Sequence, residues 1–467
     1  PTQVPTQEPQ LPVEQPAGAA GRPQGPSEPS DCFQAASDEL PPLSWQQQEV
    51  VDLVLERRES IFFTGNAGTG KSRTLHEIMR LADPATTRVT ALTGIAASAL
   101  PRAGTLHSFA GIGLGKGPAE QIVSFVQSSA AKVSAWRRCQ LLVVDEASMM
   151  SKALFELLEL VARRVRNSSK PFGGMQLCLC GDFFQLPPVA RESSLSDHGR
   201  FCFESPLWQR CIGRSVELTT VYRQKDARFL QLLAEVRYNS VSEASLGLLR
   251  ALARPLTVEK GILPTRLYSV NAAVDRINLQ CLANLPGAAR RYRAEDNPPH
   301  CTTQINNLTL CPEYLELKEG AQVMLLKNSA SHPGLVNGSR GVVVGFEAAG
   351  AGGVELPVVK WACGARGPVQ REDSTWDTSQ GRLRRLQVPL KLCWAMTIHK
   401  SQGMSIDFLQ VDLAHVFEKG QAYVALSRAR TLEGLQVCSF DPQRFWTDQR
   451  VVAFYKEHVR PMEEQPN

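Results

Sequence analysis

One short stretch, IFFTGNAGTGKSRTL at Ile61–Leu75, has the residue types and the spacing of a phosphate-binding loop. Four apolar or β-branched residues predict a buried strand, and helix-forming residues follow from Arg73. Backbone N–H groups at the start of that helix can cradle phosphates, the Lys71 ammonium can reach the β and γ oxygens, and the Ser72 hydroxyl can hold Mg²⁺. A glycine-rich turn without a ligand is the alternative, and it accounts less well for the complete motif. A nucleoside triphosphate is therefore expected to bind Gly65, Asn66, Ala67, Gly68, Thr69, Gly70, Lys71 and Ser72.

Two further strand ends carry side chains that suit hydrolysis. The run LLVVDEAS contains Asp145, which can help to hold Mg²⁺, and Glu146, which can take a proton from the attacking water. Capping of the following helix is the other use of such a pair. In the next run, GDFFQLPP, the amide of Gln185 can touch the γ-phosphate and its attacking water. An ordinary turn residue is the alternative for Gln185, although the proline pair that fixes this loop favours the first interpretation.

Short β-rich runs separated by helical stretches must position these side chains. The first series is SIFFTG, RVTALTG, QLLVVDE, MQLCLCGD and SVELTTV, and the second is TRLYSV, KLCWAM, FLQVDL, YVALSRA and LQVCSF. This alternation predicts an α/β protein with parallel sheets covered by helices on both faces. From about residue 322 to 387, apolar runs alternate with glycine-rich turns, which predicts a small antiparallel β module inserted into the second α/β domain. The segment GIGLGKGPAEQ at 111–121 is expected to form a protruding loop or hairpin.

Composition limits the class of protein. The 467 residues have room for roughly three domains, and a net charge of +5 permits a nucleic-acid partner without indicating one. Twelve scattered cysteines without a Cys-x-x-Cys pair predict reduced thiols rather than a metal site, and Cys178 and Cys180 are expected to pack in the core. No apolar run approaches membrane-spanning length, so no membrane contact is expected. The chain, expected to be a fragment because it starts at Pro1, begins with a proline-rich segment, residues 1–38, that predicts a disordered tail.

Eight sequence motifs in a fixed order point to a known family. They are GNAGTGKS, TGIAA, GTLHSFAGIG, VVDEASM, GDFFQLPPV, ELTTVYRQ, IHKSQGM and GQAYVALSRAR, and they span about Leu43 to Phe440. The set resembles the petite-integration-frequency family of DNA helicases, which belongs to the 5′-to-3′ branch of helicase superfamily one. The resemblance implies two tandem RecA-like P-loop domains, a wedge loop and an SH3-like inserted domain, with ATP and Mg²⁺ as cofactors.

The resemblance also assigns nucleotide contacts that the residues alone do not. Gln47 in LSWQQ is similar to the family glutamine that reads the adenine edge, and Gly403 in HKSQG matches a glycine near the phosphates. Arg223 and Arg428 match two arginines that reach the γ-phosphate from across a cleft, a task that suits the planar guanidinium fork. The implied catalytic set is Lys71, Glu146, Gln185, Arg223 and Arg428.

A second implied site lines the path of single-stranded DNA. Its members are Thr93, Gly94, His107, Phe109, Asn271, His399, Lys400 and Ser401. Hydroxyls, backbone amides and a lysine suit phosphate contacts, and Phe109 or His107 could stack on a base without reading its identity. Each has an ordinary alternative, since Phe109 could belong to the core and His399 could be a structural histidine.

The resemblance gives the following domain boundaries. The tail covers residues 1–38; the first RecA-like domain covers 39–222, with the wedge at about 111–135; the second covers 223–321 and 391–467; and the SH3-like domain covers 322–390.

The implied function is an ATP-dependent DNA helicase that translocates 5′ to 3′ and unwinds duplex DNA. Its expected partners are single-stranded DNA and forked duplex, with G-quadruplexes and RNA–DNA hybrids as further substrates. It is expected to act as a monomer in the basal state, in the nucleus, the mitochondrion or both, in DNA replication, recombination, repair, telomere or mitochondrial DNA maintenance. Two alternatives stay open: a translocase that strips proteins from DNA, and a nucleotide-gated DNA-binding scaffold without turnover.

Overall fold

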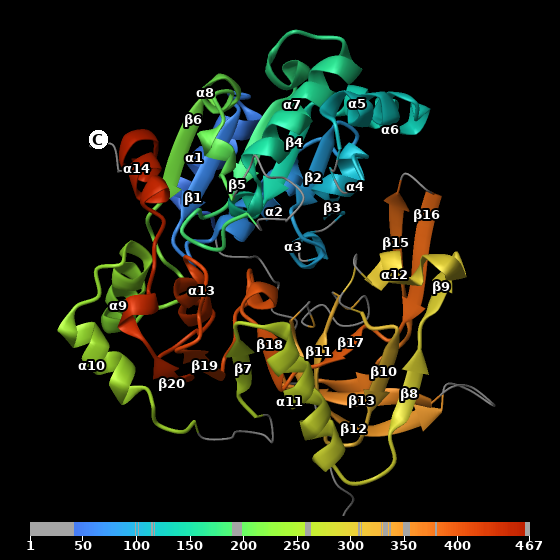
Figure 1. Cartoon of the computed structure of the whole chain (residues 1–467), viewed down its shortest axis with the longest axis vertical. Coiled ribbons are helices and arrows are strands. Elements are labelled where there is room, and N and C mark those ends of the chain that lie inside the picture. The colour runs from blue at the N-terminus through green and yellow to red at the C-terminus, as the bar shows by residue number, and fades with distance from the viewer. Residues whose placement is uncertain are drawn as a thin grey trace, which may run out of the picture. The chain divides into compact units, whose positions relative to one another are not determined.

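The computed structural model describes the chain from residue 42 to residue 462 with several short gaps (Figure 1). The gaps are residues 99, 101, 114, 116, 189–198, 257–262, 307–308, 310, 328, 330–334, 336–337, 349–354 and 379–380. The predicted tail, residues 1–38, lies outside the described residues. Within them, no helix has the length and apolar character needed to cross a membrane.

The first α/β domain is built on a seven-stranded parallel sheet in the order β21-β6-β1-β5-β4-β2-β3. Its strands are β1 (Ile61–Gly65), β2 (Thr87–Ala91), β3 (Gly104–Thr105), β4 (Leu141–Asp145), β5 (Gln176–Cys180), β6 (Arg214–Leu218) and β21 (Arg460–Pro461). The central strands are buried on both faces: Phe62 belongs to one hydrophobic cluster, whereas Phe63, Cys178 and Cys180 belong to another. Two-sided burial is typical of a parallel sheet between helical layers, and it confirms the predicted fold class.

Helices cover this sheet, and several of them begin at a residue whose side chain caps the helix. They are α1 (Trp45–Leu55), α2 (Lys71–Leu81), α3 (Gly94–Ser98), α4 (Leu106–Ala110), α5 (Ala119–Gln127), α6 (Ala130–Arg138), α7 (Lys152–Arg166), α8 (Trp208–Cys211) and α14 (Gln449–His458). In α7, Ser151 accepts a hydrogen bond from the Leu154 N–H, and Asn167 ends the helix in a left-handed conformation.

The segment 111–121, predicted to form a protruding loop or hairpin, is irregular in its described residues up to Pro118 and helical from Ala119. Residues 111–135 contain α5 and the first part of α6, while Leu114 and Lys116 lie outside the described residues. Ile122 and Val126, one helical turn apart, are buried in the cluster that also contains residues of α7. The predicted loop thus agrees with the described residues of 111–118, and this apolar stripe explains the helix that follows them.

The second α/β domain has a four-stranded parallel sheet in the order β18-β7-β19-β20. Its elements are β7 (Thr265–Tyr268), β18 (Ala395–Thr397), β19 (Leu409–Leu413), β20 (Leu435–Phe440), α9 (Ala227–Tyr238), α10 (Glu243–Ala251), α11 (Asn271–Asn284) and α13 (Gln421–Ser427). The run YVALSRA, predicted as a strand, instead forms most of α13. Every residue of α13 is buried, and a short run that is buried on all sides does not distinguish strand from helix by its periodicity.

The inserted module is antiparallel as predicted, but it begins earlier in the chain. Its five-stranded sheet, β14-β13-β12-β11-β17, contains β11 (Gln322–Leu325), β12 (Arg340–Ala348), β13 (Glu355–Trp361), β14 (Arg366–Pro368) and β17 (Leu390–Leu392). The remaining elements are β8 (Arg290–Arg293), β9 (Glu295–Asn297), α12 (Thr302–Asn306), β10 (Tyr314–Leu317), β15 (Glu372–Thr378) and β16 (Gly381–Gln387). Because β16 pairs with β9, and Tyr292 and Leu315 share the module's hydrophobic cluster, residues from about 290 belong to the module rather than to 223–321.

The end of the chain returns to the first domain, which corrects the predicted assignment of all of 391–467 to the second. Strand β21 pairs with β6, and α14 packs beside the same sheet (Figure 1). The Phe454 ring stacks on Phe203, with ring centroids 4.2 Å apart, and it also contacts Trp208. The Tyr455 hydroxyl hydrogen-bonds the Thr64 hydroxyl at 2.6 Å. This aromatic packing fixes α14 on the first sheet.

Phe454→Ala should destabilise the first domain by about 3 to 5 kcal/mol, because it leaves a cavity among packed aromatic rings. Phe125→Ala is the matched control: its side chain is 46% exposed on α5, so the expected change is within about 0.5 kcal/mol. Differential scanning calorimetry of both variants tests this. Equal melting temperatures would show that α14 is not a structural part of the first domain.

Candidate nucleotide-binding and catalytic site

The loop between β1 and α2 has the backbone of a phosphate cradle. Gly68 and Gly70 have φ angles of +90° and +83°, which residues other than glycine rarely adopt. A Cβ at Gly68 would lie 2.6 Å from the Cβ of Arg223, so glycine is also required by close approach. Because α2 begins at Lys71, the first backbone N–H groups of an eleven-residue helix face the end of the loop.

Lys71 lies inside this cradle. Its Nζ donates to the carbonyl oxygens of Gly65 at 2.8 Å and Asn66 at 3.1 Å. Burial lowers the pKa of the Lys71 ammonium, although the nearby Asp182 carboxylate opposes the shift. A phosphate group is the ligand that would offset this desolvation. The loop therefore fits the phosphates of ATP.

The acidic pair lies at the carboxyl end of β4, as predicted. Asp145 Oδ1 accepts a hydrogen bond from the backbone N–H of Glu146 at 2.8 Å, and Glu146 has left-handed backbone angles of φ 55° and ψ 42°. Such angles cost free energy in a non-glycine residue, and they aim the Glu146 side chain toward the second domain, where its Oε2 accepts from Gln402 Nε2 at 2.8 Å. Burial, reinforced by the Asp145 charge, raises the pKa of Glu146 to about 7.

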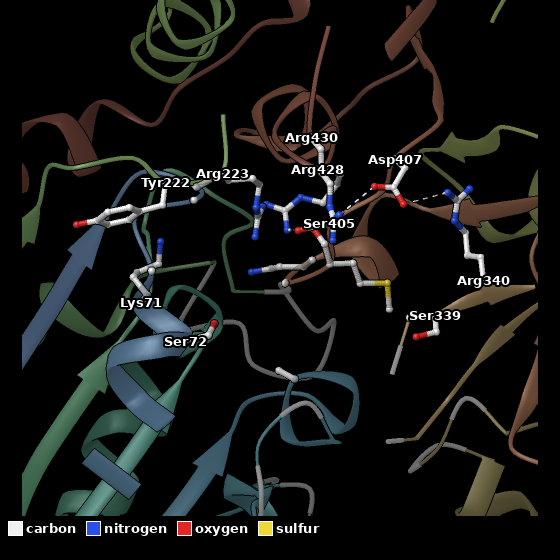
Figure 2. A pocket seen from close by; sticks show the side chains of 18 of the residues that line it. Lys71, Ser72, Tyr222, Arg223, Ser339, Arg340, Ser405, Asp407, Arg428 and Arg430 are labelled. Carbon is white, nitrogen blue, oxygen red and sulfur yellow. Dashed lines mark hydrogen bonds and ion pairs between the residues drawn. The ribbon is translucent and has the colours of Figure 1, made fainter. Parts of the chain in front are cut away.

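A cavity of about 780 Å³ joins these residues to the second domain (Figure 2). Its predicted members are Ala67, Gly68, Gly70, Lys71, Ser72, Asp145, Glu146, Gln185, Arg223, Gly403 and Arg428. The structure thus brings the five predicted catalytic side chains to one cavity, although they come from both halves of the chain. Gly65, Asn66 and Thr69 belong to the same loop without lining the cavity.

Two arginines extend toward one another in this cavity (Figure 2). Arg428 is 2% exposed, and its guanidinium donates to the Val424 carbonyl and the Ser427 hydroxyl, both at 2.9 Å. Arg223 donates to the Ser427 carbonyl at 3.3 Å. Burial, with the charge of Arg428 beside it, lowers the pKa of Arg223 to about 10, and burial also lowers that of Arg428. Two desolvated cations side by side favour an anionic ligand.

The cavity also reaches the inserted module. Asp407, in the loop before β19, lies between Arg430 at 3.2 Å and Arg340 of β12 at 3.8 Å (Figure 2). Arg340 is nearly buried and donates to the Thr265 hydroxyl at 3.0 Å, which ties β12 to the first residue of β7. The module is therefore attached to the second domain beside the same cavity.

The predicted adenine contact lies next to the phosphate loop. Gln47 is the third residue of α1 and forms a capping box with Ser44, and its Nε2 donates to the Thr69 carbonyl at 3.4 Å. Gln46 instead donates to the Thr219 hydroxyl and the Met462 carbonyl, both at 2.7 Å. The geometry supports Gln47 over its neighbour, and adenine recognition by Gln47 stays a prediction.

A divalent cation fits beside the phosphates. The Ser72 hydroxyl and the Asp145 carboxylate line the same cavity and are oxygen ligands of the kind that Mg²⁺ prefers. Across the described residues, no group of three or more His, Cys, Asp or Glu side chains could hold a metal. Phosphate oxygens and water would therefore have to complete the coordination, as is usual for Mg²⁺ in nucleotide sites.

The predicted DNA residues of the first domain follow β2 and β3. Thr93 accepts a hydrogen bond from the Ala96 N–H at 3.1 Å, and Gly94 is the first residue of α3. His107 and Phe109 lie on α4, with the Phe109 ring packed on Trp136 at a centroid distance of 4.9 Å. Phe109 is only partly buried, so the described packing leaves part of its ring exposed.

The predicted DNA residues of the second domain follow β7 and β18. Asn271 is the first residue of α11, and its side chain lies outside what the structure describes. His399 pairs with Glu418 at 2.9 Å, and the Ser401 hydroxyl is buried and donates to the Ile398 carbonyl at 2.7 Å. Burial, with the charge of Lys400 beside it, lowers the pKa of Lys391 to about 8. The DNA contacts of these residues stay predictions, and for Ser401 the backbone is the more accessible group.

Sequence reasoning missed two residues that join the domains at the site. Gln402 hydrogen-bonds Glu146, and the Tyr423 hydroxyl accepts a hydrogen bond from the Ala67 N–H of the phosphate loop at 3.0 Å. Both lie inside motifs that the sequence displays, IHKSQGM and GQAYVALSRAR. The motifs could therefore have drawn attention to both residues. Their hydrogen-bond partners could be identified only from the tertiary structure.

The fold and the site together define a motor-type ATPase in which two α/β domains share one nucleotide cavity. Residues 42–243 match the model of the PIF1-like helicase family, and residues 302–346 match that of the 2B domain of the DNA helicase Pif1. The chain belongs to the PIF1-like helicase family, a family of ATP-dependent DNA helicases.

Individual relatives support this membership. The chain is 44% identical to the human ATP-dependent DNA helicase PIF1, covering 95% of this chain and 68% of the relative, and 46% identical to the rat protein, covering 89% and 64%. It thus spans about two thirds of the length of these curated relatives. The crystal structure of Pif1 helicase from Candida albicans is similar at a TM-score of 0.78 and 37% identity, covering 89% of this chain and 99% of that one. The crystal structure of Bacteroides Pif1 bound to single-stranded DNA is similar at a TM-score of 0.66 and 29% identity, covering 89% of this chain and 96% of that one.

Gly68→Ala should weaken ATP binding by about 5- to 100-fold, because a side chain at this φ costs about 1 to 3 kcal/mol and also meets Arg223. Gly247→Ala, on helix α10 with open space around its Cβ, should leave binding unchanged and stabilise the protein slightly. Titration with a fluorescent ATP analogue measures both. Unchanged affinity in Gly68→Ala would contradict the assignment of the loop.

Proposed function

We propose that this chain hydrolyses ATP to translocate 5′ to 3′ along single-stranded DNA and to separate duplex ahead of it. The observation that carries the proposal is the shared cavity, in which Lys71, Glu146 and Gln185 of one domain meet Arg428 of the other. A cavity built in this way is complete only when both domains contribute to it. ATP binding and phosphate release can therefore drive relative motion of the domains.

Each residue of the proposed site has a distinct role in ATP hydrolysis. Lys71 and the loop N–H groups bind the phosphates, and Ser72 with Asp145 would hold Mg²⁺, which supplies charge neutralisation when bound. Glu146 accepts one proton from the attacking water as the water oxygen bonds to the γ-phosphorus. The bond from that phosphorus to the bridging oxygen breaks, and ADP leaves with the electron pair, giving ADP and inorganic phosphate. Arg223 and Arg428 stabilise the charge that develops.

Solved Pif1 structures support the nucleotide and DNA partners. Bacteroides Pif1 is described in complex with ADP-AlF4 and bound to single-stranded DNA, and a further structure concerns DNA unwinding at forked double-stranded DNA by two coordinating Pif1 helicases. We extend these partners to this chain, with G-quadruplexes and RNA–DNA hybrids as further substrates. The predicted DNA residues follow the carboxyl ends of parallel strands, the edge at which α/β sheets bind ligands.

The roles of the accessory parts belong to the same proposal. Residues 111–135, with α5 and α6, would meet the duplex junction as the wedge, and the β module would close over the strand as an SH3-like domain. We place the activity in the nucleus, the mitochondrion or both, in DNA replication, recombination, repair and telomere maintenance, as a monomer in the basal state.

Two other functions use the same fold. A translocase that strips proteins from DNA would share the complete nucleotide site, so only an unwinding assay separates it from a helicase. A nucleotide-gated scaffold without turnover would not need the full catalytic set. The meeting of Glu146, Gln185, Arg223 and Arg428 in one cavity therefore favours turnover.

Glu146→Gln should reduce DNA-stimulated ATP hydrolysis by at least about 100-fold, because the amide cannot accept the water proton. ATP and single-stranded DNA should still bind, since the amide keeps the shape of the carboxylate. Steady-state ATPase assays with and without single-stranded DNA, together with binding titrations, test this. Absence of turnover in the wild type would favour the scaffold, and turnover that does not depend on DNA would contradict a DNA-coupled ATPase.

Duplexes with a single-stranded overhang on one side test polarity and unwinding together. A 5′ overhang should support strand separation, and a 3′ overhang should not. Release of streptavidin from biotinylated single strands is the companion assay. Streptavidin release without strand separation would favour the protein-stripping translocase, and equal unwinding from both overhangs would contradict the proposed direction.

A further inference from the structure

Gln402 joins the second domain to the proposed catalytic base. It follows the short helix η5 (His399–Ser401) and is 8% exposed. Its Nε2 donates to Glu146 Oε2 at 2.8 Å. The next residue, Gly403, has φ +79°, and a Cβ there would lie 3.6 Å from Glu146 Oε1. The chain turn thus brings the Gln402 amide directly against the carboxylate.

The other end of the Gln402 amide has no protein partner. Gln402 Oε1 is buried, and no group in the described part of the chain donates to it. A buried acceptor left unpaired costs about 1 to 3 kcal/mol. Gln402 lines the nucleotide cavity and its Oε1 is closed to bulk solvent, so a molecule bound inside the cavity is the remaining source of a donor. A water molecule beside the γ-phosphate has the O–H donor that this oxygen requires.

We propose that Gln402 is a positioning residue for ATP hydrolysis, whose Nε2 fixes the Glu146 carboxylate while its Oε1 accepts a hydrogen bond from the attacking water. This inference rests on the proposed function and deepens it. One water proton is directed to Gln402 Oε1 and stays on the water oxygen, and the other passes to Glu146. The water lone pair then forms the bond to the γ-phosphorus, and the ADP oxygen leaves with its electron pair.

Gln402 and Gln185 differ in the domain from which they reach the site. Gln185 follows β5 of the first sheet, as Glu146 follows β4, so their relation is set within one domain. Gln402 comes from the second domain, so Glu146 is held correctly only when that domain is in place. The amide also lies next to the predicted DNA residues His399–Ser401. Orientation of the base is thereby made dependent on both domains.

The test replaces Gln402 by Met, which keeps the length of the side chain and removes both hydrogen bonds. With single-stranded DNA present, Gln402→Met should lower kcat by about 10- to 100-fold while KM for ATP changes by less than about threefold. Affinity for ADP-aluminium fluoride, which mimics the transition state, should fall, and affinity for ADP should not.

Gln176→Met is the matched control. The Gln176 amide at the start of β5 donates to the carbonyls of Val54 and Glu59, both at 2.8 Å, so its loss removes comparable hydrogen bonds far from the cavity. This variant should lower the melting temperature and leave kcat unchanged. If Gln402→Met does not fold, Gln402→Asn serves instead, because an amide shortened by one methylene cannot reach Glu146.

The outcomes separate the inference from the function on which it rests. A wild-type protein without ATPase activity would overturn the proposed function. An active wild type with a folded Gln402→Met variant of equal kcat would overturn only the inference, as would a rise in KM with kcat unchanged. Equal losses of affinity for ADP and for ADP-aluminium fluoride would show general damage to the nucleotide site and would also overturn it.

Discussion

The burial of cationic side chains around one cavity is the constraint on which the rest of the structure depends. Lys71, Arg223 and Arg428 are all desolvated, and burial lowers the pKa of each. Groups placed in this way are stabilised by an anion that the two domains must share. The strand order and the left-handed glycines of the loop before α2 hold these charges at the carboxyl ends of the strands. Nucleotide binding therefore acts on the relation between the domains as well as on the phosphate loop.

The residues around the cavity fall into two groups, according to the domain that holds them. Lys71 begins α2 and Glu146 follows β4, so both belong to the first domain and their relation is set within it. Arg428 and Gln402 are attached to the second domain, which also carries the inserted module through Arg340 and Asp407. A change in domain relation would therefore alter the surroundings of the γ-phosphate and the module together. The proposed hydrolysis and the proposed closure of the module over DNA thereby depend on attachment to the same domain.

Much of the fold and of the site could be predicted because their signals are local. The phosphate loop, Asp145 and Glu146 occupy short motifs whose backbone setting is encoded within a few residues. The limits of the β module could not be predicted in the same way, since β9 pairs with β16 across some ninety residues of chain, as in Arg384 with Asn297. The sequence of α13 predicts a strand because the helix is buried on all sides and its residues show no helical periodicity. The hydrogen bond between Gln402 and Glu146 spans 256 residues and depends on the relation of two domains.

The return of α14 and β21 to the first sheet means that the polypeptide crosses between the two domains twice, once after β6 and once after β20. Two crossing points define a line. Rotation about that line leaves both connections unstrained, whereas sliding or twisting across it stretches at least one of them. The covalent path of the backbone therefore favours one rotation axis for relative movement of the two domains, and a single proteolytic cut in either crossing would leave the domains covalently linked.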